Sequence, residues 1–239
     1  MSVIYEPKGR AREYGEFAVN LYSGCGHGCI YCYAPAVTYK TREQFVNASP
    51  RNKILQDLEI EARFFGGKEI TLCFTCDPYQ PIDMEHYITR RAIEILHKNN
   101  CCVNILTKGG SRSMRDFDLL SKNRQLSKYG ATLTFLDSSD SLDYEPFAAL
   151  PDERFQALQE AHKLGIQTWA SLEPVIEPEQ TLAIIEKTKD YVDVFKVGKW
   201  NHDKESDSID WRKFLRDVLD ILKRNNLKYY IKVDLANNL

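Results

Sequence analysis

Short runs of β-branched and aromatic residues alternate along the chain with longer segments in which apolar residues recur every three or four positions. The short runs have the length of buried strands, and the longer segments have the period of amphipathic helices. The expected strands are 17–21, 70–74, 102–107, 131–136, 168–172, 193–197 and 229–233. The expected helices between them are 50–65, 84–98, 113–121, 152–164, 179–189 and 211–226.

This alternation, repeated about six times, predicts how the strands pair. A helix between consecutive strands favours a parallel sheet with right-handed crossovers. Both an open doubly wound sheet and an incomplete (β/α) barrel fit the pattern, and in either fold reactive groups gather at the carboxyl ends of the strands. Because the sequence has no internal repeat and no Pro/Gly/Ser-rich linker, residues 1–239 are expected to form one domain.

The composition is that of an ordinary globular protein. Hydrophobic residues make up 43% and charged residues 28%, which argues against disorder, collagen and coiled coil. No stretch reaches the roughly 20 apolar residues that span a bilayer, and the first residues do not resemble a signal peptide. We therefore expect a cytoplasmic protein without a membrane partner. In that reducing compartment the seven cysteines should be thiols or metal ligands.

Charge is unevenly distributed along the chain. The net charge is only −2, so no global basic field indicates a nucleic-acid partner. Residues 1–53, however, carry seven Lys and Arg against four Glu, a net of +3. This basic start contains Lys8, Arg10 and Arg12 beside Tyr5 and Tyr14, residue types that bind phosphates and stack on bases. A solvated surface segment is the simpler interpretation of three such cations.

The loop after the first expected strand, residues 24–35, carries Cys25, Cys29 and Cys32 with the spacing C-x3-C-x2-C. Three neighbouring thiolates suit a [4Fe–4S] cluster in which one iron keeps an open position. Zinc held by the same cysteines and His27 is the alternative, since Cys3His sites exist. That alternative has poor geometry, because His27 lies between two ligands that are only four residues apart.

The cysteine loop, with Tyr31 directly before Cys32, resembles that of the radical S-adenosylmethionine (SAM) superfamily. Further segments are similar to its spore photoproduct lyase-like group: 20–25, 31–34, 77–81, 107–108 and 145–146. The resemblance implies a partial (β/α)6 TIM-like barrel, here with residues 1–16 as an N-terminal extension. It also implies a [4Fe–4S] cluster and SAM as cofactors. The SAM amino and carboxylate groups would bind the open iron, and a reductant such as flavodoxin or ferredoxin would drive cleavage to a 5′-deoxyadenosyl radical.

Further candidates follow from strand ends and from the resemblance. Cys76, after the second strand, is a candidate hydrogen-atom donor to a product radical; the alternative is a small half-buried residue. Asp77 is expected to bind the ribose hydroxyls or the methionine ammonium of SAM, or else to form an Asx turn before Pro78. Lys108 is expected to pair with the SAM carboxylate, unless it is a surface lysine.

Two residues are expected to touch SAM from other parts of the chain. Tyr31 would pack on the adenine, or else simply pack within its loop. Thr134, placed on the fourth strand, would donate a hydrogen bond to SAM, or else be an ordinary strand threonine.

Charged residues also occur at or inside the apolar strands near the end of the chain. Glu173, Lys196 and Lys232 are costly there unless they are paired or face a polar cavity. Glu173 is therefore a candidate for binding cofactor or substrate, and the two lysines are candidates for the substrate side; an internal salt bridge is the alternative. The remaining cysteines, Cys73 within the second strand and the adjacent pair 101–102, are expected to be structural.

The resemblance and the basic start together favour a radical SAM enzyme of lyase or transferase type. Its substrate would be a nucleic-acid base or nucleotide, which it would repair or modify. Radical modification of a small molecule or peptide is the alternative. A metal-binding module without catalysis is a third hypothesis, from a different functional class.

Overall fold

The computed structural model describes residues 2–201 and 203–238, and within them eight strands form one sheet in the order β1-β2-β5-β6-β7-β8-β9-β10. β1 (Ile4–Tyr5) runs antiparallel to β2 (Phe17–Val19), and the other neighbouring strands are parallel. The parallel strands after β2 are β5 (Glu69–Leu72), β6 (Cys102–Thr107), β7 (Ser127–Thr132), β8 (Gln167–Val175), β9 (Val194–Lys199) and β10 (Lys228–Ile231).

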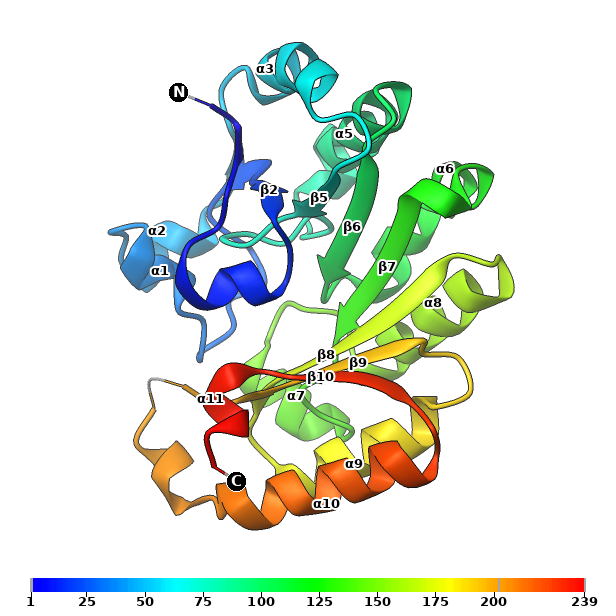
Figure 1. The fold of residues 1–239 in the computed structure, drawn as a ribbon. Helices are drawn as coiled ribbons and strands as arrows, with labels where there is room; N and C mark the ends of the chain where they lie inside the picture. The colour runs from blue at the N-terminus through cyan, green and yellow to red at the C-terminus, as the bar shows by residue number, and fades with distance from the viewer. Residues whose placement is uncertain (1, 202, 239) are drawn as a thin grey trace.

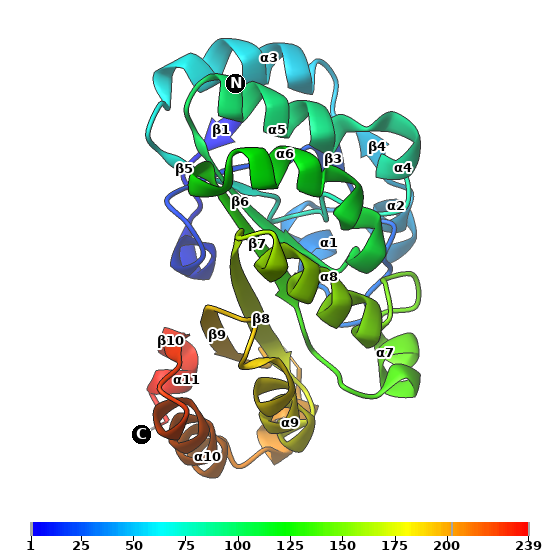
Figure 2. The same cartoon turned by 90° about the vertical axis from the view of Figure 1, so that its right-hand side faces the viewer.

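Helices on the outer side connect these strands (Figure 1). The connecting helices are α3 (Ile54–Glu61), α5 (Ile88–Lys98), α6 (Phe117–Lys122), α8 (Pro151–Lys163), α9 (Pro178–Thr188) and α10 (Trp211–Arg224). Figure 2 shows that the sheet curves into an open barrel, with β1 at one edge and β10 at the other. The predicted partial (β/α)6 barrel is therefore confirmed.

Shorter elements occupy the loops around the barrel. They are η1 (Gly9–Glu13), β3 (Tyr22–Ser23), α1 (Ala34–Val37), α2 (Arg42–Val46), β4 (Ser49–Pro50), η2 (Ala62–Phe64), α4 (Asp83–His86), η3 (Gly110–Asp116), η4 (Arg124–Leu126), α7 (Ser138–Tyr144), η5 (Glu205–Ser208) and α11 (Val233–Ala236). No helix in the described part of the chain is long and apolar enough to cross a membrane.

α10 illustrates why these segments form helices that cover the barrel. The side chain of Asp210 accepts a hydrogen bond from the Lys213 N–H and caps the first turn. Apolar residues then recur with helical spacing on one face and are buried. They are Trp211, Phe214, Leu215, Val218, Ile221 and Leu222.

Six of the seven predicted strands end at a different residue in the structure, and three of these differences move a candidate residue. β7 begins at Ser127 and ends at Thr132, so Thr134 lies beyond the strand and not on it. The sequence pattern concealed this strand because it contains Gly130, a poor strand former; a Cβ at that position would lie 2.2 Å from the Trp169 ring. β5 ends at Leu72, one residue before Cys73, and β10 ends at Ile231, so Lys232 caps α11 instead of continuing a strand.

The segment before β2 bridges the open side of the barrel, as Figure 2 shows. The Glu13 carboxylate in η1 accepts hydrogen bonds from the Val233 N–H at 3.0 Å and from the Tyr230 hydroxyl at 3.1 Å. Arg10 forms an ion pair with Asp234, with Nε and Oδ2 separated by 2.5 Å. The N-terminal segment therefore ties the first strand to the last and forms part of the wall around the barrel interior.

Candidate active site

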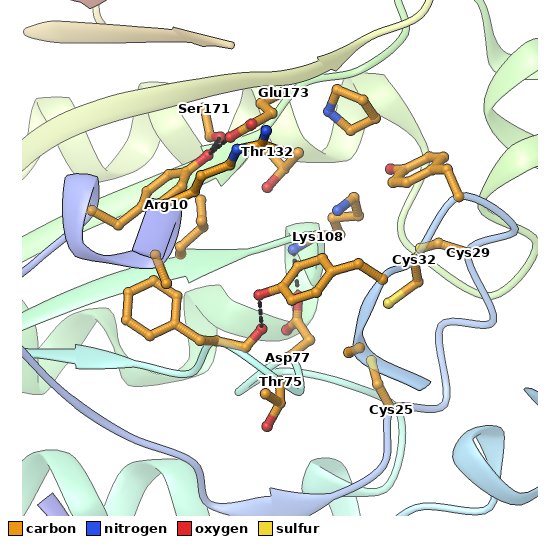
Figure 3. Close-up of a pocket in the computed structure, with 18 of the residues that line it drawn as sticks. Arg10, Cys25, Cys29, Cys32, Thr75, Asp77, Lys108, Thr132, Ser171 and Glu173 are labelled. Atoms are coloured by element: carbon orange, nitrogen blue, oxygen red, sulfur yellow. Dashed lines mark hydrogen bonds between the residues drawn. The ribbon is translucent and has the colours of Figure 1, made fainter. Parts of the chain in front are cut away.

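A cavity of about 530 Å³ lies where the carboxyl ends of the strands meet (Figure 3). Its lining includes most of the candidates selected from the sequence. These are Cys25, Cys29, Tyr31, Cys32, Cys76, Asp77, Lys108 and Glu173. The rule that reactive groups gather at the carboxyl ends of parallel strands therefore selected residues that do come together in space.

The cysteine loop is held in place by hydrogen bonds to neighbouring segments. The Cys25 N–H donates to the Phe45 carbonyl at 2.9 Å, and the Arg42 guanidinium donates to the Cys29 carbonyl at 3.2 Å. Gly24 has a φ of 95°, and a Cβ at that position would lie 2.4 Å from the Phe45 carbonyl oxygen. Only glycine fits this close approach, which brings the loop against α2.

The loop fits a cluster better than a single metal ion. Among the described residues, no three Cys, His, Asp or Glu side chains converge on one position that could hold an ion. His27 is 2% exposed and turned elsewhere, with Nδ1 3.5 Å from Asp77 Oδ2 and Nε2 3.0 Å from Arg112 Nη2. These contacts argue against zinc with His27 as the fourth ligand. The three thiols of the loop line one cavity, and a [4Fe–4S] cluster takes one thiolate on each of three irons, so the loop fits this group.

Asp77 is engaged by the protein scaffold. Its Oδ1 accepts from the Tyr79 N–H at 2.8 Å and from the Thr107 hydroxyl at 2.6 Å, and its Oδ2 accepts from the Lys108 N–H at 2.7 Å. The bond to Tyr79 is the Asx turn that the sequence left as an alternative. The carboxylate thus joins the end of β5 to the end of β6, and it fixes the backbone of Lys108 at the cavity wall.

Lys108 is not a surface lysine. Its side chain is 16% exposed, and its Nζ lies 4.0 Å from Glu145 Oε1 and 5.5 Å from the centre of the Tyr31 ring. Burial lowers the pKa of this ammonium, but the nearby Cys29 and Glu145 more than offset burial and raise the pKa above 10.5. Lys108 is therefore a charged group beside the cysteine loop, where an anionic ligand would find a partner.

A buried ion pair holds Tyr31 of the cysteine loop against the barrel wall. Glu145 and Arg154 have side chains that are 0% and 1% exposed and form a direct ion pair. Glu145 also accepts a hydrogen bond from the Tyr31 hydroxyl, which lies 3.2 Å from the Thr134 hydroxyl. Arg154 donates to the Thr132 carbonyl at 3.0 Å, at the end of β7. Tyr31 and Thr134 thus meet in one polar network with the barrel wall.

A second polar cluster lies on the part of the wall formed by β8. Glu173 accepts hydrogen bonds from the Tyr14 hydroxyl and, at 2.6 Å, from Lys232 Nζ. The Tyr14 hydroxyl also lies 3.0 Å from the Ser171 hydroxyl. Figure 3 shows Ser171 and Glu173 together, apart from the three cysteines. The sequence left an internal salt bridge open as an alternative for these charges, and the structure contains one between Glu173 and Lys232, both of which line the cavity.

Lys196 has a different position from the other two charges in this group. Its Nζ donates to the carbonyl oxygens of Glu13 and Tyr14, both at 3.2 Å. Burial lowers the pKa of Lys196 to about 8. The contacts of Lys196 secure the N-terminal segment, which makes its observed role structural.

Sequence reasoning missed three residues that shape the site: Glu145 as an anchor, Arg154 and Tyr14. Arg154 carried a usable signal, because it lies on the buried face of α8 together with Phe155 and Leu158. A charge at such a position requires a buried partner. Tyr14 carried no comparable local signal, since its hydrogen-bond partner Glu173 is 159 residues away.

Comparison with known proteins agrees with this geometry. The radical SAM superfamily model matches residues 19–192, which is well over half of the chain. An uncharacterized protein of Methanocaldococcus jannaschii, MJ0683, is 29% identical over 165 residues, covering 67% of this chain and 61% of that protein. The chain therefore spans less than two thirds of the length of this relative.

Two solved structures share the fold. SuiB of Streptococcus suis bound to S-adenosylmethionine has a TM-score of 0.68 and 15% identity, covering 90% of this chain and 49% of SuiB. Spore photoproduct lyase complexed with dinucleoside spore photoproduct has a TM-score of 0.73 and 12% identity, covering 95% of this chain and 78% of the lyase. With the family match, the partial barrel and the cysteine loop on its inner wall, the chain belongs to the radical SAM superfamily, whose cofactors are SAM and a [4Fe–4S] cluster.

Proposed function

We propose that this protein is a radical SAM enzyme that repairs or modifies a nucleic-acid base or nucleotide. The observation that carries the proposal is the cavity, which has three thiols on one side and polar and cationic groups on the other. The cofactors would supply a 5′-deoxyadenosyl radical there. The residues of this chain would hold the cofactors, orient the substrate and return a hydrogen atom to the product.

Cys25, Cys29 and Cys32 would bind the cluster. Lys108 would pair with the SAM carboxylate, because its ammonium is charged and lies beside the cysteine loop. Tyr31 would pack on the adenine through its ring, since its hydroxyl is already bonded to Glu145.

Asp77 and Thr134, the remaining candidates for cofactor binding, would act by positioning neighbouring residues. Asp77 would position Lys108 through its backbone, because its own oxygens already accept several hydrogen bonds. Thr134 would act through Tyr31. We propose the substrate side for Glu173, in a cluster with Tyr14 and Lys232.

The charge around the cavity supports an anionic substrate. The basic side chains in its lining are Lys8, Arg10, Lys108, Lys199 and Lys232, against the acidic Asp77 and Glu173. Phosphates of a nucleotide or of a single strand fit such a lining. Spore photoproduct lyase, with a dinucleoside bound in a similar fold, also favours this class.

Modification of a peptide is the second candidate, because SuiB bound to its precursor peptide SuiA also has this fold. Anaerobically reconstituted protein should be incubated with SAM, dithionite and either oligonucleotides or peptides, and 5′-deoxyadenosine and labelled product measured. A nucleic-acid substrate should bind less tightly as salt rises, because phosphate neutralisation releases counterions. Product from peptides only, with no such salt dependence, would favour the second candidate.

Replacing Lys108 with alanine should weaken SAM binding without loss of iron. A hydrogen bond to a charged group is worth about 1.5–3 kcal/mol, which corresponds to roughly 10- to 150-fold in affinity. SAM titration of the reconstituted protein, followed by the spectrum of the cluster, measures the change. Lys98→Ala is the control, since Lys98 is 74% exposed. An unchanged SAM affinity in Lys108→Ala would remove Lys108 from the SAM site.

Replacing Cys76 with alanine should separate SAM cleavage from product formation. The variant should still make 5′-deoxyadenosine, because that step needs only the cofactors, but it should leave a trapped radical or a by-product. Product made by the wild type in heavy water should carry deuterium, since thiol hydrogens exchange with solvent. Product free of deuterium, formed equally well by Cys76→Ala, would show that Cys76 only packs beside the cofactor.

A further inference from the structure

Two thiols outside the cysteine loop meet at the cavity wall. Cys73 follows the last residue of β5 and is 4% exposed, and Cys76 is half-buried. Both line the same cavity as the three cysteines of the loop. Two residues separate Cys73 from Cys76, and the chain bends directly after Cys73. The expected core position of Cys73 is confirmed, whereas its expected place inside a strand is corrected, because β5 ends at Leu72.

The turn that carries these thiols is held in shape by a side chain from another segment. Asn20, which is 7% exposed, accepts hydrogen bonds through its Oδ1 from the Phe74 N–H at 2.8 Å and from the Thr75 N–H at 2.9 Å. These are the two residues between the cysteines. The Asn20 amide also donates to the Tyr5 hydroxyl at 2.7 Å, which fixes its own orientation. The backbone between the two cysteines is thus fixed before any reaction.

Cys101 and Cys102, the other two cysteines outside the loop, are not part of the cavity lining. Cys101 is fully buried, and its thiol donates to the Phe65 carbonyl at 3.3 Å. Cys102 begins β6, at the amino end of the strand and away from the cavity. Cys73 and Cys76 combine C-x2-C spacing across a bend with a place on the wall of one cavity, and C-x2-C is the spacing of redox-active dithiols.

We propose that Cys73 and Cys76 form a redox-active dithiol site that a small disulfide, such as oxidised glutathione, converts to an intramolecular disulfide. The Cys76 sulfur, which is the more exposed, attacks the glutathione disulfide, gives a mixed disulfide and releases one glutathione. The Cys73 sulfur then attacks the Cys76 sulfur and releases the second glutathione. Both protein thiols are oxidised, glutathione disulfide is reduced, and the two thiol protons pass to the two released glutathione molecules.

The order of the two attacks follows from burial. Cys73 lies inside the wall, and burial raises its pKa well above the ordinary value for a thiol. As the less accessible of the two thiols, Cys73 acts as the resolving thiol after the mixed disulfide has formed on Cys76. Its position in the turn held by Asn20 supplies the proximity that this step requires.

The consequence for catalysis rests on the proposed function. The disulfide has no S–H at Cys76, so the oxidised enzyme has no hydrogen atom to return from that position. SAM cleavage would continue in the oxidised protein, while product completion would stop until a dithiol reductant restored Cys76.

Disulfide mapping on the reconstituted holoenzyme tests the proposal. The holoenzyme is equilibrated anaerobically with mixtures of reduced and oxidised glutathione, quenched in acid, alkylated and digested. We expect a peptide linking Cys73 to Cys76, lighter by two hydrogen atoms and resistant to alkylation, whose fraction rises with the proportion of oxidised glutathione. Cys73→Ala should lose this species and accumulate glutathione on Cys76, and Cys102→Ala should behave as the wild type.

A variant of the full chain that cannot bind the cluster makes the test independent of the cluster. The full chain with Cys25, Cys29 and Cys32 all changed to serine should form the same disulfide. Separate alkylation of Cys73 and Cys76 in both proteins, at every glutathione ratio, would overturn the proposal. Disulfide formation in a holoenzyme that does not cleave SAM would support the dithiol and contradict the proposed function, so the two failures are distinguishable.

Discussion

Cys32→Ala is expected to lose nearly all cluster iron and to reduce SAM cleavage to the background without enzyme. Cys32 lies on the cavity wall with Cys25 and Cys29, and three thiolates are the minimum set that leaves one iron open. Loss of one ligand leaves two irons without a protein thiolate, which the cluster does not tolerate. Iron and sulfide analysis and 5′-deoxyadenosine formation with SAM and dithionite measure the two effects.

Cys101→Ala is the matched control for this experiment. Cys101 is fully buried, and its thiol lies within hydrogen-bond distance of the backbone carbonyl groups of Ala62, Phe65 and Asn99. The variant should keep its iron and its SAM cleavage. A Cys32→Ala protein with full iron and full activity would contradict the cluster assignment, and a Cys101→Ala protein without iron would show that a ligand had been mistaken for a core residue.

Arg154→Met is expected to be the most destabilising of the substitutions considered. It removes the partner of a carboxylate that is 0% exposed and also removes the donors to the Ala149 and Thr132 carbonyls. Breaking a buried ion pair on one side costs about 3–5 kcal/mol of unfolding free energy. Urea unfolding of the cluster-free protein measures this loss without contributions from the cofactors.

Two further variants identify why Arg154→Met loses unfolding free energy. Lys163→Met removes an exposed ion pair with Glu160 from the same helix, and such pairs are worth only about 0–1 kcal/mol. Glu145→Gln combined with Arg154→Met should recover part of the stability, because no unpaired carboxylate remains. Equal losses from Arg154→Met and Lys163→Met would contradict the importance of the buried pair.

The ion pair between Glu145 and Arg154 also predicts how the stability of the fold depends on pH. Burial raises the pKa of Glu145, but Arg154 and Lys108 outweigh burial and hold the pKa below 4.5 in the folded protein. A carboxyl group with a depressed folded-state pKa stabilises the fold above its unfolded pKa. This stabilisation is therefore present above pH 4.5 and is lost as the pH falls below it.

Most of the fold could be predicted because each element carries its own local pattern. β6 was predicted residue for residue, since a run of apolar and β-branched residues ends at Lys108 and two glycines. β7 was placed four residues too late, because Lys128 and Gly130 inside it belong to residue types that are depleted in strands. The single helix expected over 84–98 is divided at Tyr87, which has a φ of 52°.

The sequence alone determined the chemistry that depends on neighbouring positions in the chain. The spacing of Cys25, Cys29 and Cys32 predicted a three-thiol metal loop, and strand ends identified Asp77 and Lys108 as residues of the cavity. These features are readable because a few residues of one loop, or the end of one strand, contain the whole signal.

Only the tertiary structure decided which distant groups would complete the site. Tyr31 is bonded to Glu145 across 114 residues of sequence, and Tyr14 to Glu173 across 159. Such pairs form because the curved sheet brings segments that are distant in the sequence to one place, where buried polar groups must find partners. No local pattern records which partner each group will meet, so the anchoring of the cysteine loop and the polar wall opposite it are properties of the folded barrel.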